Sequence, residues 1–139
     1  MANKIFIDTG AFIALNDKSD QYHLKATAIF KKLLKDNSSV LFTSNLVISE
    51  TYTRILYISK PEIAIKFLDI IKQISISILY SDHQIENKSI EFLKKYKNEK
   101  ISYTDAVSFL LMKENKISKA FAFDRHFLLA DYILLDETH

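Results

Sequence analysis

The most informative property of this sequence is what it lacks. Its 139 residues contain no cysteine, one proline and one glycine. Without cysteine the chain can form no disulfide, no thiolate metal site and no cysteine nucleophile. A single glycine, Gly10, rules out glycine-rich phosphate loops and dinucleotide-binding fingerprints, which need several glycines at fixed spacing. The GxSxG and HExxH motifs are absent as well, so several large enzyme classes are excluded.

The chain also lacks long apolar runs and a strong net charge. No run approaches the ~20 apolar residues of a membrane span, and residues 4–7 read as a strand rather than as part of a signal peptide. We therefore expect a cytoplasmic protein. The net charge is only +2, and all but two of the 19 basic residues are lysines. Their clusters at residues 31–35 and 94–100 fit either solvent-exposed helix faces or a surface that attracts phosphate.

What the sequence does contain is the pattern of one globular domain. Hydrophobic residues make up 48% and charged residues 26% of the chain, which is typical of a folded domain in water. We find no repeat, low-complexity stretch or linker, so we expect a single domain over residues 1–139. A chain of this length can bury roughly two-thirds of its unfolded surface in a core.

Short β-rich apolar runs alternate with longer segments of helical periodicity. Ser44 and Ser102 are placed to cap two of these helices. We predict strands at residues 4–7, 40–43, 76–79, 119–123 and 132–135, and helices at residues 20–36, 45–58, 61–72, 82–97 and from Ser102 to about 116. This alternation predicts an α/β fold of three α/β/α layers around a mostly parallel five-stranded sheet. The functional crevice of such a sheet lies at the carboxyl ends of its strands.

Four acidic residues are placed at that edge by the predicted topology. Asp8 and Asp124 directly follow two predicted strands. Asp105 falls in the first turn of a helix that leads into a strand, so its helix begins at the carboxyl edge. Glu50 falls in the second turn of the helix that follows another strand. Taken singly, each acid also fits an ordinary strand end, helix start or solvated helix face.

The joint pattern favours a metal site. Glu50 and Asp105 stand in largely apolar helices, where a carboxylate usually needs a partner. Clustered carboxylates repel one another unless a cation joins them, and oxygen ligands select a hard cation such as Mg²⁺ or Mn²⁺. Such an ion supports hydrolysis of phosphodiester bonds. Thr9 and Thr104 adjoin two of the acids, and their hydroxyls fit either the orientation of water or a carboxylate, or simply a helix start.

Four motifs, in this order, resemble the PIN-domain family and especially its small VapC-like toxins. They are Ile5-Phe6-Ile7-Asp8-Thr9, Ser44-Asn45-Leu46 with Glu50, Tyr103-Thr104-Asp105-Ala106, and Phe121-Ala122-Phe123-Asp124-Arg125-His126-Phe127. The likeness covers nearly the whole chain. No single motif is specific, but four in sequence are a strong signal.

The resemblance implies an endoribonuclease that uses Mg²⁺ or Mn²⁺, a homodimer and, for a toxin, a cognate antitoxin. By position, Asp8, Glu50, Asp105 and Asp124 form the catalytic quartet, with Asp8, Asp105 and Asp124 as the metal ligands. Phe127 resembles a packing residue. Residues 125–126 fit either a contact with substrate phosphate or a solvated loop. Neither Asp131 nor Asp136 matches the further acid that some family members carry, so both one and two metal ions stay open.

Other families with acids at the ends of parallel strands fit less well. A response-regulator receiver needs an acidic pair at the first strand, but Asp8 has no acidic neighbour. A haloacid-dehalogenase-type phosphatase needs Asp-x-Asp, and position 10 is Gly10. The alternative from another class is a catalytically silent PIN-like scaffold that binds RNA or protein. Such relatives typically lose acids, whereas this chain keeps all four, and metal binding by the isolated protein separates the two classes.

Overall fold

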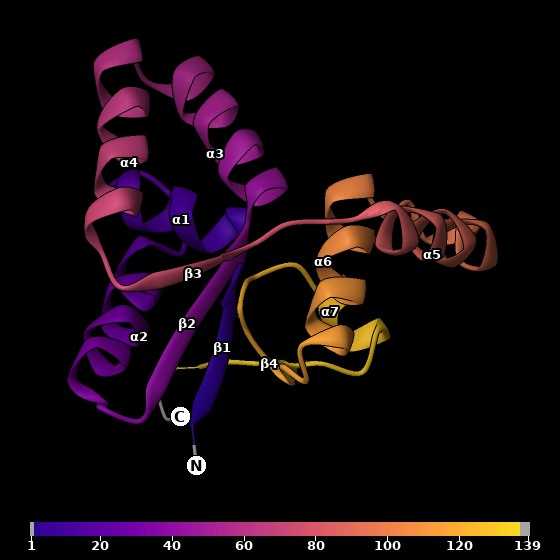
Figure 1. Cartoon of the computed structure of the whole chain (residues 1–139). Helices are drawn as coiled ribbons and strands as arrows, with labels where there is room; N and C mark the ends of the chain where they lie inside the picture. The colour runs from indigo at the N-terminus through magenta and orange to yellow at the C-terminus, as the bar shows by residue number, and fades with distance from the viewer. Residues whose placement is uncertain (1, 137–139) are drawn as a thin grey trace.

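The computed structural model describes residues 2–136. Its centre is a five-stranded sheet with the strand order β3-β2-β1-β4-β5 (Figure 1). Every neighbouring pair runs parallel, so the predicted parallel sheet is confirmed. The strands are β1 (Asn3–Ile7), β2 (Ser39–Ser44), β3 (Ile76–Leu79), β4 (Lys119–Phe121) and β5 (Ile133–Leu134).

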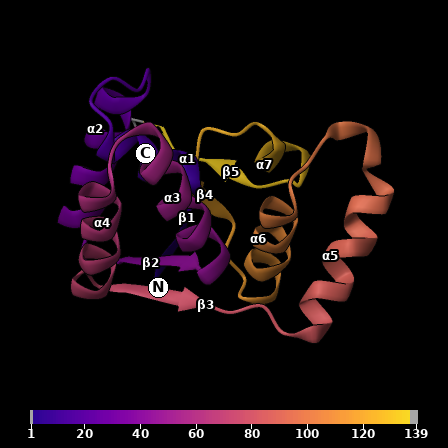
Figure 2. The same ribbon diagram turned by 90° about the horizontal axis from the view of Figure 1, so that it is seen from above.

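Helices cover both faces of this sheet. They are α1 (Thr9–Asn16), α2 (His23–Lys35), α3 (Asn45–Ile58), α4 (Pro61–Gln73), α5 (His83–Lys95), the 3-10 helix η1 (Lys97–Glu99), α6 (Tyr103–Glu114) and α7 (His126–Leu129). Helices α1 to α4 lie on one face and α5 to α7 on the other (Figure 2). Right-handed crossovers produce this division, because the chain reverses its direction across the sheet between β3 and β4.

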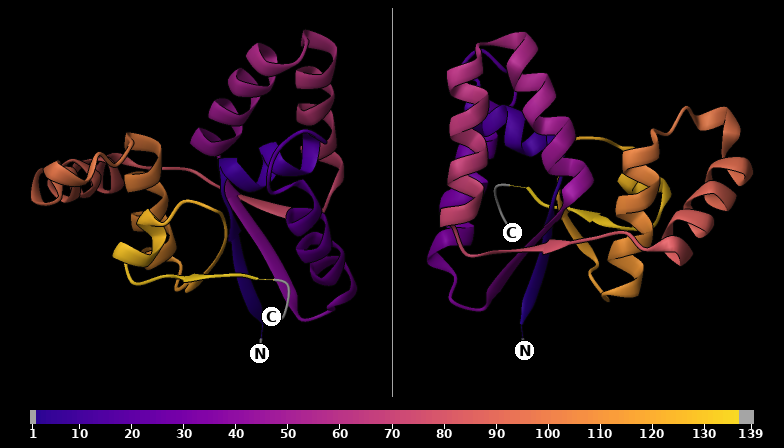
Figure 3. Two further views of the ribbon diagram at one scale, coloured as in Figure 1. Left: turned by 180° about the vertical axis from the view of Figure 1, so that it is seen from behind. Right: turned by 45° about the horizontal axis from the view of Figure 1, so that its top comes forward.

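The outermost helix is α5, which packs against α6 and projects away from the sheet (Figure 3). Helix α6 therefore lies between α5 and the sheet. None of the helices described over residues 2–136 is long and apolar enough to cross a membrane.

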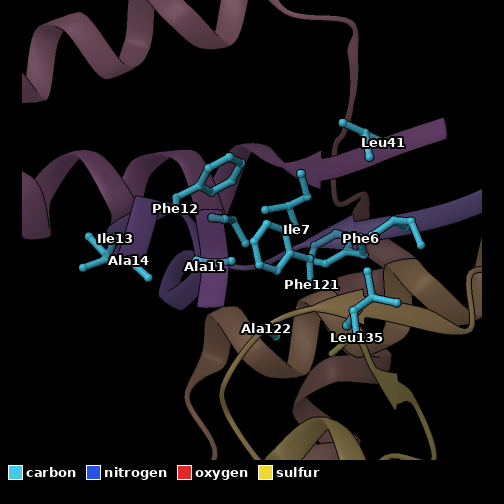
Figure 4. Packing of buried hydrophobic residues seen from close by; sticks show 14 of the residues in the cluster. Phe6, Ile7, Ala11, Phe12, Ile13, Ala14, Leu41, Phe121, Ala122 and Leu135 are labelled. Atoms are coloured by element: carbon cyan, nitrogen blue, oxygen red, sulfur yellow. The ribbon is translucent and has the colours of Figure 1, made fainter. Parts of the chain in front are cut away.

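Strand β1 is the most firmly held element of the core. Residues 5–7 have fully buried side chains. Phe6 and Ile7 lie beside Phe121 of β4 and Phe12 of α1 in one cluster (Figure 4). Burial of each large apolar side chain stabilises the fold by roughly 1.5–3 kcal/mol. The chain is thus fixed immediately before Asp8.

Two capping serines act as predicted. The Ser44 hydroxyl accepts a hydrogen bond of 3.1 Å from the backbone NH of Val47 at the start of α3. The Ser102 hydroxyl accepts one of 3.0 Å from the backbone NH of Asp105 at the start of α6. Each bond satisfies an NH group that has no partner within the helix. These caps fix where both helices begin, and therefore where Glu50 and Asp105 stand along them.

Helices α1 and α7 were not predicted from the sequence. Residues 11–14 of α1 are all buried, so this short helix shows none of the alternation between apolar and polar faces that reveals a surface helix. Helix α7 has only four residues, which is too few for helical periodicity to appear.

The predicted lengths of the last two strands were wrong. Strand β4 ends at Phe121 and not at residue 123. The backbone NH of Asp8 donates a 3.0 Å hydrogen bond to the Phe121 carbonyl, and β1 then gives way to α1. No strand remains beside residues 122–123, so pairing stops there. Strand β5 correspondingly contains only Ile133–Leu134 rather than residues 132–135.

Several predicted helix ends also shift. Helix α2 begins at His23 instead of residue 20, because Asp20 Oδ1 accepts a 2.8 Å hydrogen bond from the Tyr22 NH and forms a turn first. Leu34 lies within this helix but is 62% exposed. Helix α5 ends at Lys95, two residues early, and α6 ends at Glu114, before Lys116 takes a φ of 57°.

Candidate functional site

The four predicted acids line one pocket at the carboxyl edge of the sheet. The pocket has a volume of about 270 Å³. Its lining consists of Asp8, Thr9, Gly10, Glu50, Arg54, Lys100, Ser102, Asp105, Asp124 and His126. Its lining includes residues that follow β1 and β4. The connections after these two strands leave toward opposite faces of the sheet (Figure 2), and a binding crevice in a parallel sheet usually lies at such a point.

Each acid reaches the pocket from a different segment. Asp8 follows β1 directly and is the residue before α1. Glu50 comes from the second turn of α3 and is half-buried. Asp105 comes from the first turn of α6. Asp124 comes from the loop between β4 and α7, with 36% of its side chain exposed. The edge predicted from topology is therefore where the structure brings these side chains together.

Asp8 is the most deeply placed of the four acids. Burial raises the pKa of its carboxyl to about 7, the charges of Glu50 and Asp124 add to the rise, and the backbone NH groups of Thr9 and Gly10 oppose it. Within residues 2–136, the buried Asp8 Oδ1 has no hydrogen-bond partner. A buried carboxylate oxygen without a partner is costly, so a cation beside Asp8 would stabilise the site.

Asp105 and Asp124 share a hydrogen bond. Burial raises the pKa of Asp105 to about 9, and the charge of Asp8 and the hydrogen bond to Asp124 contribute further. Burial also acts to raise the pKa of Asp124, but hydrogen bonds from Asp105 and His126 outweigh it and hold that pKa below its usual range. Two close carboxyls cannot both ionise easily without a cation. In the metal-free protein the shared proton therefore resides on Asp105.

The donor atoms around this pair fit a divalent cation. One ligand atom each from Asp105, Asp124 and His126 lie within 4.8 Å of one another. The Nδ1 atom of His126 is 3.0 Å from Asp124 Oδ1, which also accepts a 2.8 Å hydrogen bond from the His126 backbone NH. Asp8, whose Oδ1 has no hydrogen-bond partner among the described residues, lines the same pocket. Carboxylate oxygens with at most one imidazole are the donor set of Mg²⁺ or Mn²⁺.

The two predicted threonines differ. Thr9 lines the pocket, and its hydroxyl is buried without a hydrogen-bond partner in the described part of the chain. Thr104 is half-buried and is not among the pocket-lining residues. Phe127 is fully buried, as expected of a packing residue. Of residues 125–126, only His126 lines the pocket.

Sequence reasoning missed two cations of the pocket, Arg54 and Lys100. A signal for the first exists, because Arg54 stands four residues after Glu50 and thus on the same face of α3. Lys100 stands two residues before the cap of α6. In the sequence it is one member of a lysine cluster, and nothing distinguishes it from its neighbours.

Comparison with known proteins identifies the family to which this chain belongs. A model of the PIN domain matches residues 5–131. The chain is 34% identical over 125 residues to a protein named VapC ribonuclease from Archaeoglobus fulgidus, covering 88% of this chain and 78% of that protein. It is 29% identical over 129 residues to the 23S rRNA-specific endonuclease VapC20 of Mycobacterium tuberculosis, covering 93% and 95% of the two chains.

Solved structures agree with this match. The crystal structure of Mycobacterium tuberculosis VapC20, described as a Sarcin-Ricin loop cleaving toxin, has a TM-score of 0.87 and 26% identity, covering 95% of this chain and 98% of that chain. VapBC2 from Rickettsia felis has a TM-score of 0.71 at 14% identity, over 95% and 97% of the chains, and shows a shared fold. The chain belongs to the PIN-domain family. Within that family it is VapC-like, as its four motifs implied.

Proposed function

We propose that this protein is a metal-dependent endoribonuclease that hydrolyses RNA phosphodiester bonds at the acidic pocket. One observation carries the proposal: four carboxylates from four segments line one pocket, and the most buried of them, Asp8, keeps an oxygen without a partner. The named activities of the VapC relatives support RNA as the substrate. In a catalytically silent scaffold without a bound cation, these clustered carboxylates would only repel one another.

Asp8, Asp105 and Asp124 are the residues that would hold Mg²⁺ or Mn²⁺, with His126 as a further donor. A bound ion supplies charge neutralisation at the phosphate and activation of water. Asp105 must release its proton for this, because its pKa of about 9 keeps it protonated in the metal-free protein near neutral pH.

The remaining side chains have roles that do not depend on direct contact with the ion. Glu50, the fourth member of the quartet, lines the pocket from α3 and can accept a proton from water there. The Thr9 hydroxyl is buried beside Asp8 without a partner, so it can orient that carboxylate or a water molecule.

We further propose that the protein is a toxin that a cognate antitoxin restrains in the cytoplasm. A guanidinium is the simplest mask for an acidic pocket, because it is always charged and forms paired hydrogen bonds with carboxylates. Helices α3 and α4 expose apolar side chains that can supply affinity, including Tyr57 (82% exposed), Ile58 (56%) and Ile65 (50%). We also expect a homodimer, which size-exclusion chromatography with light scattering tests.

The deciding experiment is a nuclease assay on mixed cellular RNA with Mn²⁺. Wild type should cleave, and both EDTA and Asp8→Asn should abolish cleavage while circular dichroism shows an unchanged fold. Full activity in EDTA would rule out metal dependence. Expression alone should also slow the growth of a bacterial host, and Asp8→Asn should relieve this effect. If wild type cleaves RNA in vitro but is harmless in cells, the toxin role is wrong and the nuclease role stands.

A further inference from the structure

Two cations stand at a pocket whose other charged residues are acids. Arg54 and Lys100 both line the acidic pocket, and both are exposed residues. Neither takes part in any ion pair between described residues. Cations beside four carboxylates would be expected to pair with them if their role were to balance the charge of the fold. Their charges are instead available to a negatively charged ligand.

Arg54 is placed by α3. It lies one turn beyond Glu50, and an acid four residues before a base is the favourable order for a pair along a helix. No Glu50–Arg54 ion pair forms among the described residues. A guanidinium presents a planar fork of NH groups that matches the oxygens of a phosphate. Arg54 can therefore meet a phosphate at the α3 side of the pocket.

Lys100 is placed by the turn between η1 and α6. Its backbone has φ 54° and ψ 46°, a left-handed conformation that costs a residue with a side chain roughly 1–2 kcal/mol relative to the right-handed region. Lys116, beyond the other end of α6, also has a positive φ, of 57°, and does not line this pocket. The conformation is thus no evidence of function by itself, but Lys116 offers a matched control for Lys100.

The chemistry of the substrate explains why such a pocket needs cations. RNA is a polyanion, and phosphates next to the cleaved one would approach four carboxylates. A metal ion neutralises charge only where the reaction takes place. Helices α3 and α6 belong to different crossovers and lie beside each other at this edge (Figure 2), so Arg54 and Lys100 enter from two separate walls.

We propose that Arg54 and Lys100 bind the RNA backbone, holding phosphates on either side of the cleaved phosphodiester. This inference rests on the proposed nuclease function. Contacts with phosphate position a nucleic acid without reading its sequence, so the two residues set affinity and register but not the choice of bases. Because the phosphates that they contact do not react, Arg54 and Lys100 should bind the substrate equally well in the ground state and in the transition state.

Binding is measured by fluorescence anisotropy of a labelled RNA oligonucleotide with a single-stranded loop, in Mg²⁺ and with Asp8→Asn as the background that prevents cleavage. Adding Arg54→Gln or Lys100→Asn should weaken binding several-fold. Each should also reduce the slope of log affinity against log salt by about 0.7, the value for one lost contact with single-stranded RNA. Lys116→Asn should change neither quantity. Equal effects of Lys100→Asn and Lys116→Asn would overturn the inference.

Cleavage kinetics in the otherwise wild-type protein supply a second measurement. Loss of uniform binding raises KM and leaves kcat unchanged, so Arg54→Gln and Lys100→Asn should act in this way, and Arg54→Lys should partly restore KM. Asparagine tolerates the left-handed conformation, so Lys100→Asn should melt no lower than wild type. A fall in kcat with constant KM would contradict a role in substrate binding.

These experiments test the nuclease function and the phosphate contacts of Arg54 and Lys100 independently of each other. If wild type cleaves RNA and Asp8→Asn does not, the nuclease function holds; unchanged binding in both Arg54→Gln and Lys100→Asn then overturns only the phosphate contacts. If wild type cleaves no RNA but its RNA affinity depends on Arg54 and Lys100 and not on Lys116, the phosphate contacts hold and the nuclease function is wrong.

Discussion

The two edges of the sheet use polar side chains in opposite ways. At the amino edge, Lys119 Nζ donates a 3.1 Å hydrogen bond to Asn3 Oδ1, and Lys4 Nζ donates one of 3.0 Å to the carbonyl of Asn115. At the carboxyl edge, Asp8 Oδ1 is buried without a partner among the described residues. The two lysines of the amino edge are hydrogen-bonded within the chain, whereas the carboxyl edge gathers carboxylates whose mutual repulsion a bound cation would relieve.

This difference separates stability from function within one sheet. Sequences generally avoid unpaired buried polar groups, and exceptions concentrate at functional sites. The burial of β1 explains how the exception is tolerated, because the fully buried residues 5–7 hold the chain in place before Asp8. Changes at the carboxyl edge should therefore affect activity far more than folding, and changes at the amino edge should do the reverse.

The largest expected effect is on catalysis. Asp105→Asn keeps the size of the side chain but removes a proposed metal ligand. Loss of a residue that only supports a ligand typically costs 10–100-fold in metal affinity or activity, so loss of a ligand should lower the cleavage rate by roughly 100-fold or more. Steady-state cleavage of RNA in Mn²⁺ measures it.

Asn3→Ala at the amino edge is the control for this measurement. It should leave the cleavage rate unchanged, because Asn3 begins β1 at the end opposite the pocket. Equal losses of activity in Asp105→Asn and Asn3→Ala would remove the functional distinction between the two edges.

The next effect is stabilisation by metal. An ion that binds only the folded state stabilises it by about 2.7 kcal/mol at a concentration 100 times its Kd. Thermal unfolding of wild type should therefore shift upward when Mn²⁺ replaces EDTA. The shift should shrink strongly in Asp8→Asn and Asp105→Asn. An equal shift in wild type and both variants would place the ion elsewhere.

A smaller effect follows from pH. A carboxyl whose pKa is higher in the folded chain binds more protons there between its two pKa values, so the free energy of unfolding falls as pH rises through that window. The window runs from 3.8 to about 7 for Asp8 and from 3.8 to about 9 for Asp105. Metal-free protein should therefore be less stable near pH 8 than near pH 5, by more than about 1 kcal/mol. Urea unfolding in EDTA measures this.

Asp8→Asn removes one of these titrating groups and serves as the control. Its stability should vary less with pH, and near pH 8 it should exceed wild type by about 1 kcal/mol because like-charge repulsion is relieved. If Asp8→Asn is clearly less stable in EDTA, the Asp8 carboxylate is a structural hydrogen-bonding group.

The quartet of acids was predictable because each of its signals is local. Asp8 directly follows an apolar strand, and Asp105 follows a capping serine by three residues. Parallel topology then brings strand ends and helix starts to one edge without any knowledge of side-chain contacts. The same topology predicted Asp124 at this edge even though β4 ends three residues before it.

The remaining features depend on tertiary contacts that the sequence does not display. The end of β4 is set by the hydrogen bond from Asp8 to Phe121 and by the turn of β1 into α1. The positions of Arg54 and Lys100 in the pocket depend on how α3 and the start of α6 lie around it. A periodic pattern locates a helix but not its neighbour. The spacing of Arg54 from Glu50 therefore puts both on one face of α3 without showing what that face lines, and Lys100 had no distinguishing signal.

The smallest expected effect belongs to the amino edge. Lys119→Met keeps the length and apolar stem of the side chain but removes the donor to Asn3 Oδ1, and both residues are half-buried. A hydrogen bond of this kind contributes about 0.5–1.5 kcal/mol, so urea unfolding should show a loss within that range.

A double-mutant cycle with Asn3→Ala isolates the pair, and the double variant should lose less than the sum of the two single losses. The coupling should be the same near pH 5 and pH 8, because Asn3 and Lys119 begin β1 and β4 at the ends opposite the acidic pocket. RNA cleavage by Lys119→Met should equal that of wild type. A coupling that varies with pH as strongly as the stability of wild type would mean that the two edges are electrostatically linked through the sheet.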